Sequence, residues 1–252
     1  MNIINPNAKI GKNVKIDSFT TIHEDVEIGE GSWIGSNVTI FPGARIGDNC
    51  KIYPGSVISS TPQDLKFNNE KTIAKIGDNS IIREYVTINR GTEVTKKTEV
   101  GKNCFIMAYC HIAHDCTIGD NCIIANAVNL AGHVNIENSV VMGGLCAVKQ
   151  FLTIGKYCMI SGGSLVRKDV PPFIKVAKEP LKFIGINIIG LKRNDFTEES
   201  IKNIKNSYRL FSQKGYNISQ TINILEKKDI LSKEEQEIIN FIDNSKNGII
   251  KF

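Results

Sequence analysis

The sequence has no apolar segment that approaches the roughly 20 residues needed to span a membrane. Its first residues, MNIINPNAKIG, lack the basic and then apolar segments of a secretory signal peptide. The net charge is only +5, without basic clusters interleaved with aromatic residues, which argues against a nucleic-acid-binding surface. We therefore expect a cytoplasmic protein with no membrane span and no nucleic-acid partner.

What the chain has in abundance is an aliphatic residue at every sixth position. From Ile4 to Val166 this position holds Ile, Val, Leu or Met, and only Asp64 and Glu70 break the pattern. A helix repeats every 3.6 residues and an ordinary strand every two, so neither produces such a period. A period of six is typical of the parallel β-helix, in which three hexapeptides form one triangular coil of about 18 residues. The sequence thus predicts a mainly β protein, with a parallel β-helix over residues 1–171. Other proteins with this repeat suggest that the coil is left-handed.

The seven cysteines follow the same repeat. Each lies two positions before an aliphatic position, where other repeats have Val or Ser; they are Cys50, Cys104, Cys110, Cys116, Cys122, Cys146 and Cys158. Seven is an odd number, and nothing indicates secretion, so we expect no disulfide framework. A small thiol suits a tight interior corner, and we interpret the cysteines as packing residues.

Two polar stretches predict loops that leave the coil. Residues 61–75 contain both positions that break the repeat, and residues 91–100 are also rich in charge and threonine. Loops on a rigid scaffold are where binding groups are often carried. These loops are therefore candidates for part of a functional site.

After residue 171 the repeat stops and the composition becomes helical. Thr197 has the side chain of an N-cap, and Gly215 is placed to end the helix that follows it. Ser232 and Glu235 have the spacing of a capping box before a further helix. We expect residues 172–252 to form a C-terminal α-helical domain on the end of the β-helix.

Three of the four histidines gather on one edge of the predicted coil. Residues 18 apart should stack, and His111 lies beside two such columns, which contain His114, Gly132 and Gln150, and Asp115 and His133. A histidine oriented by a carboxylate is a natural general base near neutral pH. Clusters of titratable groups also mark functional sites more often than chance, so this edge is the candidate site.

Two chemistries fit this cluster. Three histidine nitrogens that converge on one point, from one chain or shared between chains of a trimer, would bind Zn²⁺, as in the γ-class carbonic anhydrases, which share the hexapeptide fold. Alternatively, a histidine removes a proton from an acceptor hydroxyl as it attacks a thioester, and the N–H of Gly132 stabilises the oxyanion. A third possibility is a scaffold without catalysis, in which these residues only stabilise the fold.

Ordered motifs along nearly the whole chain resemble one family. They are QDLK (63–66), IREYVTINRGT (82–92), HIAHDCTIG (111–119), NLAGHV (129–134), AVKQF (147–151), DVPPF (169–173) and GINIIGLKR (185–193). Together they resemble the acyl-[acyl-carrier-protein]–UDP-N-acetylglucosamine O-acyltransferases, which carry out the first step of lipid A biosynthesis. The resemblance implies a homotrimer of left-handed β-helices with active sites between neighbouring subunits, and it favours acyl transfer over the other two interpretations.

The resemblance also implies the substrates and the roles of the site residues. The donor would be an (R)-3-hydroxyacyl chain on the phosphopantetheine of acyl carrier protein, the acceptor UDP-N-acetylglucosamine, and the chain would bind no metal and no cofactor of its own. His114 would be the general base for the 3-hydroxyl, supported by Asp115 and by an oxyanion donor at Gly132. Sugar and nucleotide would be held by Gln63, Asp64, Lys66, His111, His133, Gln150, Asn187 and Arg193.

Gly162 resembles the position that limits acyl-chain length in the family, and it is predicted to stack on Gly144. A glycine leaves room, so we expect a long donor of about fourteen carbons, each methylene of which gains from apolar burial. The chain departs from the family pattern at Lys149, Ile189 and Asn194. Some relatives acylate a 3-amino sugar nucleotide, and that acceptor stays open beside the 3-hydroxyl.

Overall fold

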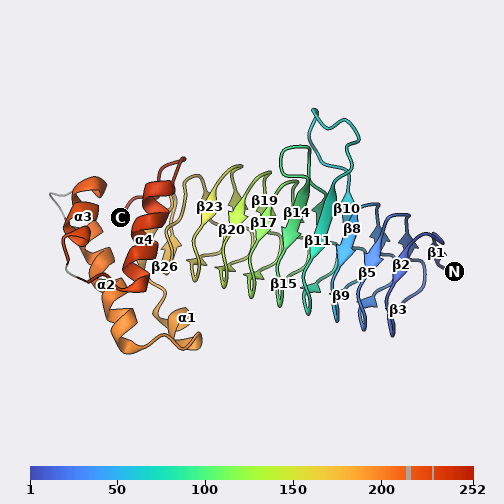
Figure 1. Ribbon diagram of the computed structural model, residues 1–252, viewed down its shortest axis with the longest axis horizontal. Coiled ribbons are helices and arrows are strands. Elements are labelled where there is room, and N and C mark those ends of the chain that lie inside the picture. Colours follow the sequence, from blue (N-terminus) through green and yellow to red (C-terminus); the bar gives the residue numbers. More distant parts are fainter. Residues whose placement is uncertain (214–216, 229) are drawn as a thin grey trace.

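The computed structural model describes residues 1–213, 217–228 and 230–252, and it has the predicted architecture of stacked coils (Figure 1). Strands that are three apart in the chain pair in parallel, which gives the rod three flat sheets. Sheet A consists of β1 (Ile3–Ile4), β4 (Thr21–Ile22), β7 (Thr39–Ile40), β10 (Val57–Ser60), β13 (Thr87–Asn89), β16 (His111–Ile112), β19 (Asn129–Leu130), β22 (Ala147–Val148) and β25 (Leu165–Val166).

The other two sheets run along the remaining sides of the rod. Sheet B consists of β2 (Lys9–Ile10), β5 (Glu27–Ile28), β8 (Ala44–Ile46), β11 (Ile73–Ile76), β14 (Lys97–Val100), β17 (Thr117–Ile118), β20 (Asn135–Ile136) and β23 (Thr153–Ile154). Sheet C consists of β3 (Lys15–Ile16), β6 (Trp33–Ile34), β9 (Lys51–Ile52), β12 (Ile81–Ile82), β15 (Phe105–Ile106), β18 (Ile123–Ile124), β21 (Val141–Met142), β24 (Met159–Ile160), β26 (Ile174–Ala177) and β27 (Lys182–Ile186).

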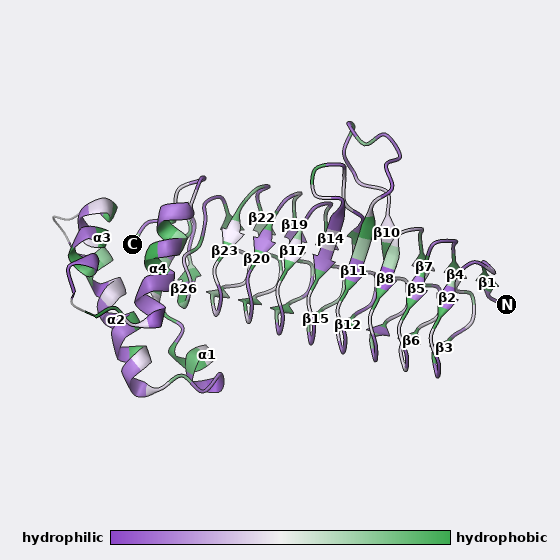
Figure 2. Ribbon diagram, viewed as in Figure 1, coloured by the Kyte–Doolittle hydropathy of each residue, from purple (hydrophilic) through white to green (hydrophobic). Residues whose placement is uncertain are grey.

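The aliphatic position of each hexapeptide forms the core. Ile112 pairs with Ile88 on one side and with Leu130 on the other, and all three are fully buried. Each coil thus covers the apolar side chains of its neighbour, which is why the period persists for so many repeats. Ile4 and Ile10 are still exposed, because they belong to the first of the described coils and only one neighbouring coil covers them. Figure 2 shows hydrophobic residues recurring on the strands and mainly hydrophilic residues in the projecting loops.

The predicted packing role of the cysteines is confirmed, since all seven are buried and unpaired. Their thiols also lie within bonding distance of backbone carbonyls on the next coil. Cys116 Sγ lies 3.1 Å from the carbonyl oxygen of Ala131, and Ser80 Oγ donates an equivalent bond of 2.8 Å to Gly101. The corner therefore selects a small side chain that can also donate to the neighbouring coil.

The recurring Gly-Asp-Asn sequence has a similar explanation. Asp120 Oδ1 accepts a 2.7 Å hydrogen bond from the backbone N–H of Lys102 on the preceding coil. A Cβ at Gly101 would lie only 2.5 Å from this oxygen, so the bond requires a glycine there. Asn121, which follows Asp120, has a φ of 59°, a left-handed conformation that asparagine adopts more readily than most residues. The motif thus joins consecutive coils at this corner.

The two predicted loops are present, but both are shorter than expected. Residues 61–72 and 91–96 leave the coil, whereas the ends of the predicted stretches form β11 and β14. Val57 pairs with Thr87 and Ile73 with Lys97, so each insertion is a multiple of six residues. The aliphatic period therefore continues across both loops.

The C-terminal part begins as strand rather than helix. β26 pairs with β24 in parallel and β27 returns antiparallel to β26, so sheet C continues to Ile186. The helices that follow are α1 (Ile188–Arg193), α2 (Glu198–Phe211), α3 (Ile218–Glu226) and α4 (Lys233–Asn244). Among the described residues, no helix is both long and apolar enough to cross a membrane.

The predicted helix starts are confirmed. Thr197 accepts from the N–H of Ser200 at the start of α2, and Ser232 and Glu235 form a capping box at α4. The predicted end at Gly215 lies outside the described residues. Tyr208 of α2 is buried and donates a 2.7 Å hydrogen bond to the carbonyl of Pro172, which attaches the helices to the end of the rod.

Candidate active site

The predicted histidine edge is the corner between sheets A and B. Asp115, His133 and Phe151 occupy the same position on three successive coils, each with φ between 59° and 68°. The rings of His133 and Phe151 stack at 4.6 Å, and the ring of His114 meets that of His133 edge-on at 5.2 Å. The stacking that the 18-residue coil predicts is thus confirmed for these columns.

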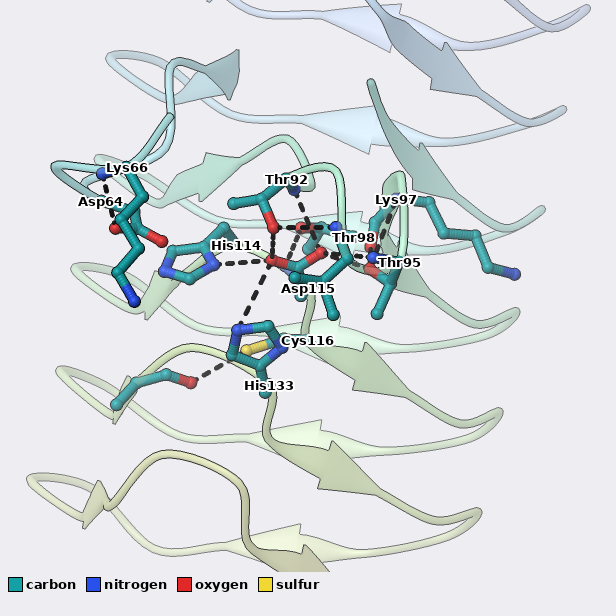
Figure 3. A network of polar contacts seen from close by, with 12 residues as sticks. Asp64, Lys66, Thr92, Thr95, Lys97, Thr98, His114, Asp115, Cys116 and His133 are labelled. Atoms are coloured by element: carbon teal, nitrogen blue, oxygen red, sulfur yellow. Dashed lines mark hydrogen bonds and ion pairs between the residues drawn. The ribbon is translucent and has the colours of Figure 1, made fainter. Parts of the chain in front are cut away.

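His114 and Asp115 form a hydrogen-bonded pair (Figure 3). The Nδ1 atom of His114 lies 2.7 Å from Oδ2 of Asp115, whose side chain is fully buried. Burial alone would raise the pKa of Asp115, but hydrogen bonds from Thr95, His114 and Thr92 outweigh it and hold the pKa at about 2. At neutral pH Asp115 is therefore a carboxylate that only accepts, so in the neutral imidazole of His114 the proton lies on Nδ1 and Nε2 has the free lone pair. This is the state of a histidine that is ready to take up a proton.

Gly132 lies directly against the ring of His114. A Cβ at this position would be 2.8 Å from Nε2 and 2.7 Å from Cε1 of His114, closer than real Cβ contacts. Glycine therefore keeps the unprotonated nitrogen accessible. Among the residues that the structure describes, no group accepts a hydrogen bond from the Gly132 N–H, which leaves this donor available.

The other two histidines of the cluster have different surroundings. His133 Nε2 lies 3.8 Å from Oδ2 of Asp115, whereas His111 Nδ1 is hydrogen-bonded to the hydroxyl of Thr87 at 2.8 Å. Burial and the nearby charge of His114 lower the pKa of His111. His111 is therefore neutral near pH 7 and takes part in a polar contact on sheet A.

This geometry does not fit a three-histidine zinc site within one chain. The candidate metal ligands that lie within 4.8 Å of one another are His114, Asp115 and His133, and His111 is not among them. Both oxygens of Asp115 already accept hydrogen bonds, from Thr92 and Thr95 among others. Metal binding would have to replace these contacts, so the pair is better suited to proton transfer.

Of the other predicted binding residues, three lie in the 61–72 loop and one on the corner. Gln63 and Lys66 are exposed, and the backbone N–H of Lys66 donates to Asp64 at 3.0 Å. Figure 3 shows Asp64 and Lys66 in the view beside His114. Gln150 is exposed on the coil that follows Gly132. The loop thus brings polar and cationic groups to the side of the rod that carries His114.

Asn187 and Arg193 lie elsewhere, at the two ends of α1. Figure 1 shows α1 and the loop between β10 and β11 on different sides of the molecule and well apart along it. Asn187 is buried as the N-cap of α1, and its amide nitrogen donates to the carbonyl of Tyr157 at 2.9 Å. Arg193 is exposed, and Asn194 ends the helix with a 2.8 Å bond to Gly190. One copy of the chain does not bring these residues to His114.

Gly162 occupies its predicted place in a column of three residues. A Cβ at Gly162 would lie 3.1 Å from the carbonyl oxygen of Gly144, and one at Gly144 would lie 3.1 Å from that of Asn126. This column borders sheet A on the side opposite the His114 corner. Ala147 and Leu165 point outward from the part of sheet A that lies between the column and that corner. Because Gly144 and Gly162 have no side chains, nothing projects from this edge of sheet A at those two positions.

The threonines around Asp115 are residues of the candidate site that the sequence analysis missed. Thr92 and Thr95 lie in the 91–96 loop and Thr98 in β14, and all three contact Asp115. The available signal was the six-residue insertion before Asp115, because its threonines Thr92 and Thr95 lie 23 and 20 residues from Asp115 and thus about one coil away once the insertion is allowed for.

Comparison with known proteins agrees with this architecture. A family model described as domain 2 of the UDP-N-acetylglucosamine O-acyltransferases matches residues 169–250, and the bacterial transferase hexapeptide model matches residues 7–42, 25–60 and 97–132. A crystal structure of a UDP-N-acetylglucosamine acyltransferase from Bacteroides fragilis shares 44% identity, with a TM-score of 0.97 over 99% of this chain and 98% of that one. The predicted left-handed parallel β-helix is thereby confirmed.

Two further relatives extend the comparison. The enzyme structure from Acinetobacter baumannii has a TM-score of 0.94 and 36% identity over 99% of this chain and 98% of that chain. A curated acyl-[acyl-carrier-protein]–UDP-N-acetylglucosamine O-acyltransferase from Xylella fastidiosa is 39% identical over 254 residues, which cover 99% of this chain and 95% of the relative. The chain therefore belongs to the acyl-[acyl-carrier-protein]–UDP-N-acetylglucosamine O-acyltransferase family.

Proposed function

We propose that this protein transfers an (R)-3-hydroxyacyl chain from acyl carrier protein to the glucosamine 3-hydroxyl of UDP-N-acetylglucosamine, with His114 as the general base. Membership of the family makes the chain an acyltransferase of the first step of lipid A biosynthesis. The observation that carries the proposed mechanism is the pairing of His114 Nδ1 with a buried carboxylate, which leaves Nε2 unprotonated beside Gly132.

The proposed reaction is a direct transfer in two stages. Nε2 of His114 removes the proton from the 3-hydroxyl as its oxygen attacks the thioester carbonyl carbon, and the N–H of Gly132 donates to the developing oxyanion. When the tetrahedral intermediate collapses, the carbon–sulfur bond breaks and the ester remains on the sugar. The protonated His114 then returns the proton to the departing phosphopantetheine thiolate. Asp115 stays ionised throughout and stabilises the imidazolium.

The residues around the pair are suited to hold the acceptor. We assign Lys66, an exposed cation in the 61–72 loop, to a phosphate of the nucleotide, and Gln63 and Asp64 to the sugar. His111 and His133, which flank His114, and Gln150 on a following coil complete the sugar contacts in this proposal. Each is a hydrogen-bonding group on the same side of the rod as His114.

The acyl chain would cross sheet A. The surface between His114 and Gly162 carries Ala147 and Leu165, whose apolar side chains point outward from neighbouring coils. Burial of methylenes against such residues favours a long chain, and the missing side chain at Gly162 leaves its end open. We therefore retain the expectation of a long donor.

The separation of α1 from His114 supports the homotrimer. If Arg193 and Asn187 bind the same nucleotide as Lys66, they must come from a neighbouring copy, because one copy holds them apart. The active site would then lie between two subunits. We also propose that the protein works in the cytoplasm, where reducing conditions keep its seven thiols free, and that it needs no bound cofactor.

Product analysis tests the proposed function. Purified protein is offered 3-hydroxyacyl carrier proteins of several chain lengths with UDP-N-acetylglucosamine or its 3-amino analogue, and the products are identified by mass spectrometry. An ester at the 3-position, formed fastest from long donors, is the expected result. If only the amino analogue is acylated, the acceptor in the proposal is wrong and is the 3-amino sugar nucleotide instead. If neither acceptor is acylated, the proposed function is refuted.

A further inference from the structure

We propose that Thr92 and Thr95, in the 91–96 loop, are positioning residues that hold Asp115 so that its carboxylate fixes the orientation and tautomer of His114. The proposal rests on the proposed function, in which His114 is the base. It assigns a role to a six-residue insertion that lies between β13 of sheet A and β14 of sheet B, beside the site, and is not needed to complete a coil. Neither threonine touches the reacting atoms, so their effect would pass through Asp115.

The two threonines satisfy the carboxylate from one side. Oδ1 of Asp115 accepts from the backbone N–H of Thr92 at 3.0 Å and of Thr95 at 3.3 Å, and it also contacts the Thr95 hydroxyl. Oδ2 accepts from the Thr92 hydroxyl at 2.8 Å and from His114 at 2.7 Å (Figure 3). Four donors from one short loop therefore surround the carboxylate, whose hydrogen-bonded histidine partner is His114 and whose Oδ2 also has His133 Nε2 at 3.8 Å.

The proton positions follow from the chemistry of the groups. The Thr95 hydroxyl also lies 2.8 Å from the carbonyl of Lys97, and because it has a single proton, the charged Asp115 carboxylate is the stronger acceptor. The Thr92 hydroxyl accepts from the N–H of Val94 at 3.3 Å, which directs its own proton to Asp115. Both hydroxyls thus act as donors to the carboxylate.

The loop itself is held in one shape. Gly91, at its first residue, lies against the backbone of Lys97 with no space for a Cβ, so the two ends of the loop are in contact. The backbone N–H of Lys96 donates a 2.8 Å hydrogen bond to the carbonyl of Thr92. On the other side, the backbone N–H of Asp115 donates to the hydroxyl of Thr98 at 2.9 Å, which fixes the backbone of the residue as well as its side chain. A preorganised group of donors of this kind needs no rearrangement during the reaction.

Burial makes these donors necessary. The Asp115 side chain is inaccessible to solvent, so water cannot replace a lost hydroxyl. Without the donors, burial would favour protonated Asp115, and a protonated acid can donate to Nδ1 instead of accepting from it. The proton on His114 would then lie on Nε2, and the base would be lost.

The test compares valine with serine at both threonines, alone and together. Thr→Val keeps the shape and removes the hydroxyl, whereas Thr→Ser keeps the donor. In the double valine variant we expect kcat to fall about 10- to 100-fold with an unchanged KM for the sugar nucleotide, since misorientation of a catalytic group has effects of this size. The acid limb of the pH–rate profile should move to higher pH, because Asp115 loses donors to its charged form. The serine variants should retain most of the activity.

A second readout does not depend on turnover. In ¹⁵N-histidine NMR spectra, assigned with a His114→Gln variant, the wild type should show His114 protonated at Nδ1, and the double valine variant should show an increased share of the Nε2–H form. Thr20→Val is the matched control, because Thr20 is a buried threonine several coils from His114. Its hydroxyl donates a 2.9 Å hydrogen bond to the carbonyl of Gly35. It should lower stability without changing the spectrum of His114.

The outcomes separate this proposal from the proposed function. An unchanged tautomer and pH profile in the double valine variant, or equal losses in the serine and valine variants, would overturn the positioning role. An active His114→Gln enzyme would instead refute the role of His114 as base, whatever the threonines do.

Discussion

At the scale of single residues, the site depends on two side chains and on the absence of a third. His114 and Asp115 are adjacent in sequence, and adjacent residues on a strand point to opposite faces. They meet here because Asp115 has a φ of 59°, which turns the chain at the corner. The left-handed residue is therefore part of what allows the pair to form.

Gly132→Ala tests the close approach at Nε2 of His114. The new Cβ would lie 2.8 Å from this nitrogen and would force the ring away from its position. We expect kcat to fall about 10- to 100-fold, as for other small displacements of a catalytic group, with little loss of stability. Steady-state kinetics and thermal unfolding of the purified variant measure both. Gly35→Ala, whose Cβ would lie 2.9 Å from Cδ of Pro54 and several coils from His114, is the control for a crowded methyl group on the solenoid. An alanine variant at Gly132 with wild-type kcat would show that the ring tolerates the contact.

At the scale of elements, the join between the rod and α4 contains a half-buried acid, Glu137. Glu137 accepts from the backbone N–H of Lys156 at 2.9 Å, and Lys156 also pairs with Glu237 of α4 at 2.6 Å. Burial raises the pKa of Glu137, with Glu237 adding to the effect, although the Lys156 N–H and ammonium oppose it. The native state therefore binds this proton more tightly than the unfolded chain does.

The sign of the pH dependence follows from that direction. Stability is lost as pH rises from the ordinary glutamate pKa through the raised value, because the unfolded chain ionises first. Glu137→Gln keeps an acceptor for Lys156 without the charge, so it should raise the Tm at pH 7.5 and leave the Tm near pH 4 unchanged. Thermal unfolding at the two pH values measures this difference. A variant that is less stable at pH 7.5 would mean that the carboxylate stabilises the join.

At the scale of the whole molecule, a site shared between subunits makes a prediction about mixed trimers. His114→Ala removes the base and Arg193→Ala removes a proposed nucleotide contact, and each variant alone should have little activity. If neighbouring copies supply the two residues, co-expression in equal amounts restores about a quarter of the sites in a statistical mixture of closed trimers.

Activity of the co-expressed sample, compared with each variant alone and with wild type, measures the recovery. The two variants mixed without subunit exchange are the control. Recovery in the co-expressed sample alone supports the shared site. No recovery, in a sample shown by native mass spectrometry to contain mixed trimers, would mean that both residues act within one chain.

Much of this architecture could be predicted from the sequence, because the core position repeats. The period of six predicted the coil, the place of the cysteines at its corners and the stacking of His114 on Gly132. Each of these depends on a constant 18-residue offset. The continuation of sheet C through β26 and β27 carries no such period and was not predicted. The exact ends of the two loops were also missed, since their last residues are polar on the outer face yet pair in sheet B.

The threonine contacts to Asp115 could not be read from spacing alone. Thr92 is 23 residues from Asp115, an offset that becomes meaningful only when the 91–96 insertion is known. The role of Asn187 as the N-cap of α1 was not predicted either, because the sequence analysis interpreted this residue only through the family motif, which indicated a nucleotide contact. Its contact with the nucleotide stays a prediction.

The central claim is that His114 is the base of acyl transfer. The most direct measurement is the rate of ester formation by His114→Ala on acyl carrier protein donors and UDP-N-acetylglucosamine, with the fold and oligomeric state verified in the same sample. The account predicts a loss of at least about 10²–10⁴-fold, the usual contribution of a general base, with no change in assembly. A folded variant that retained most of the wild-type rate would contradict it.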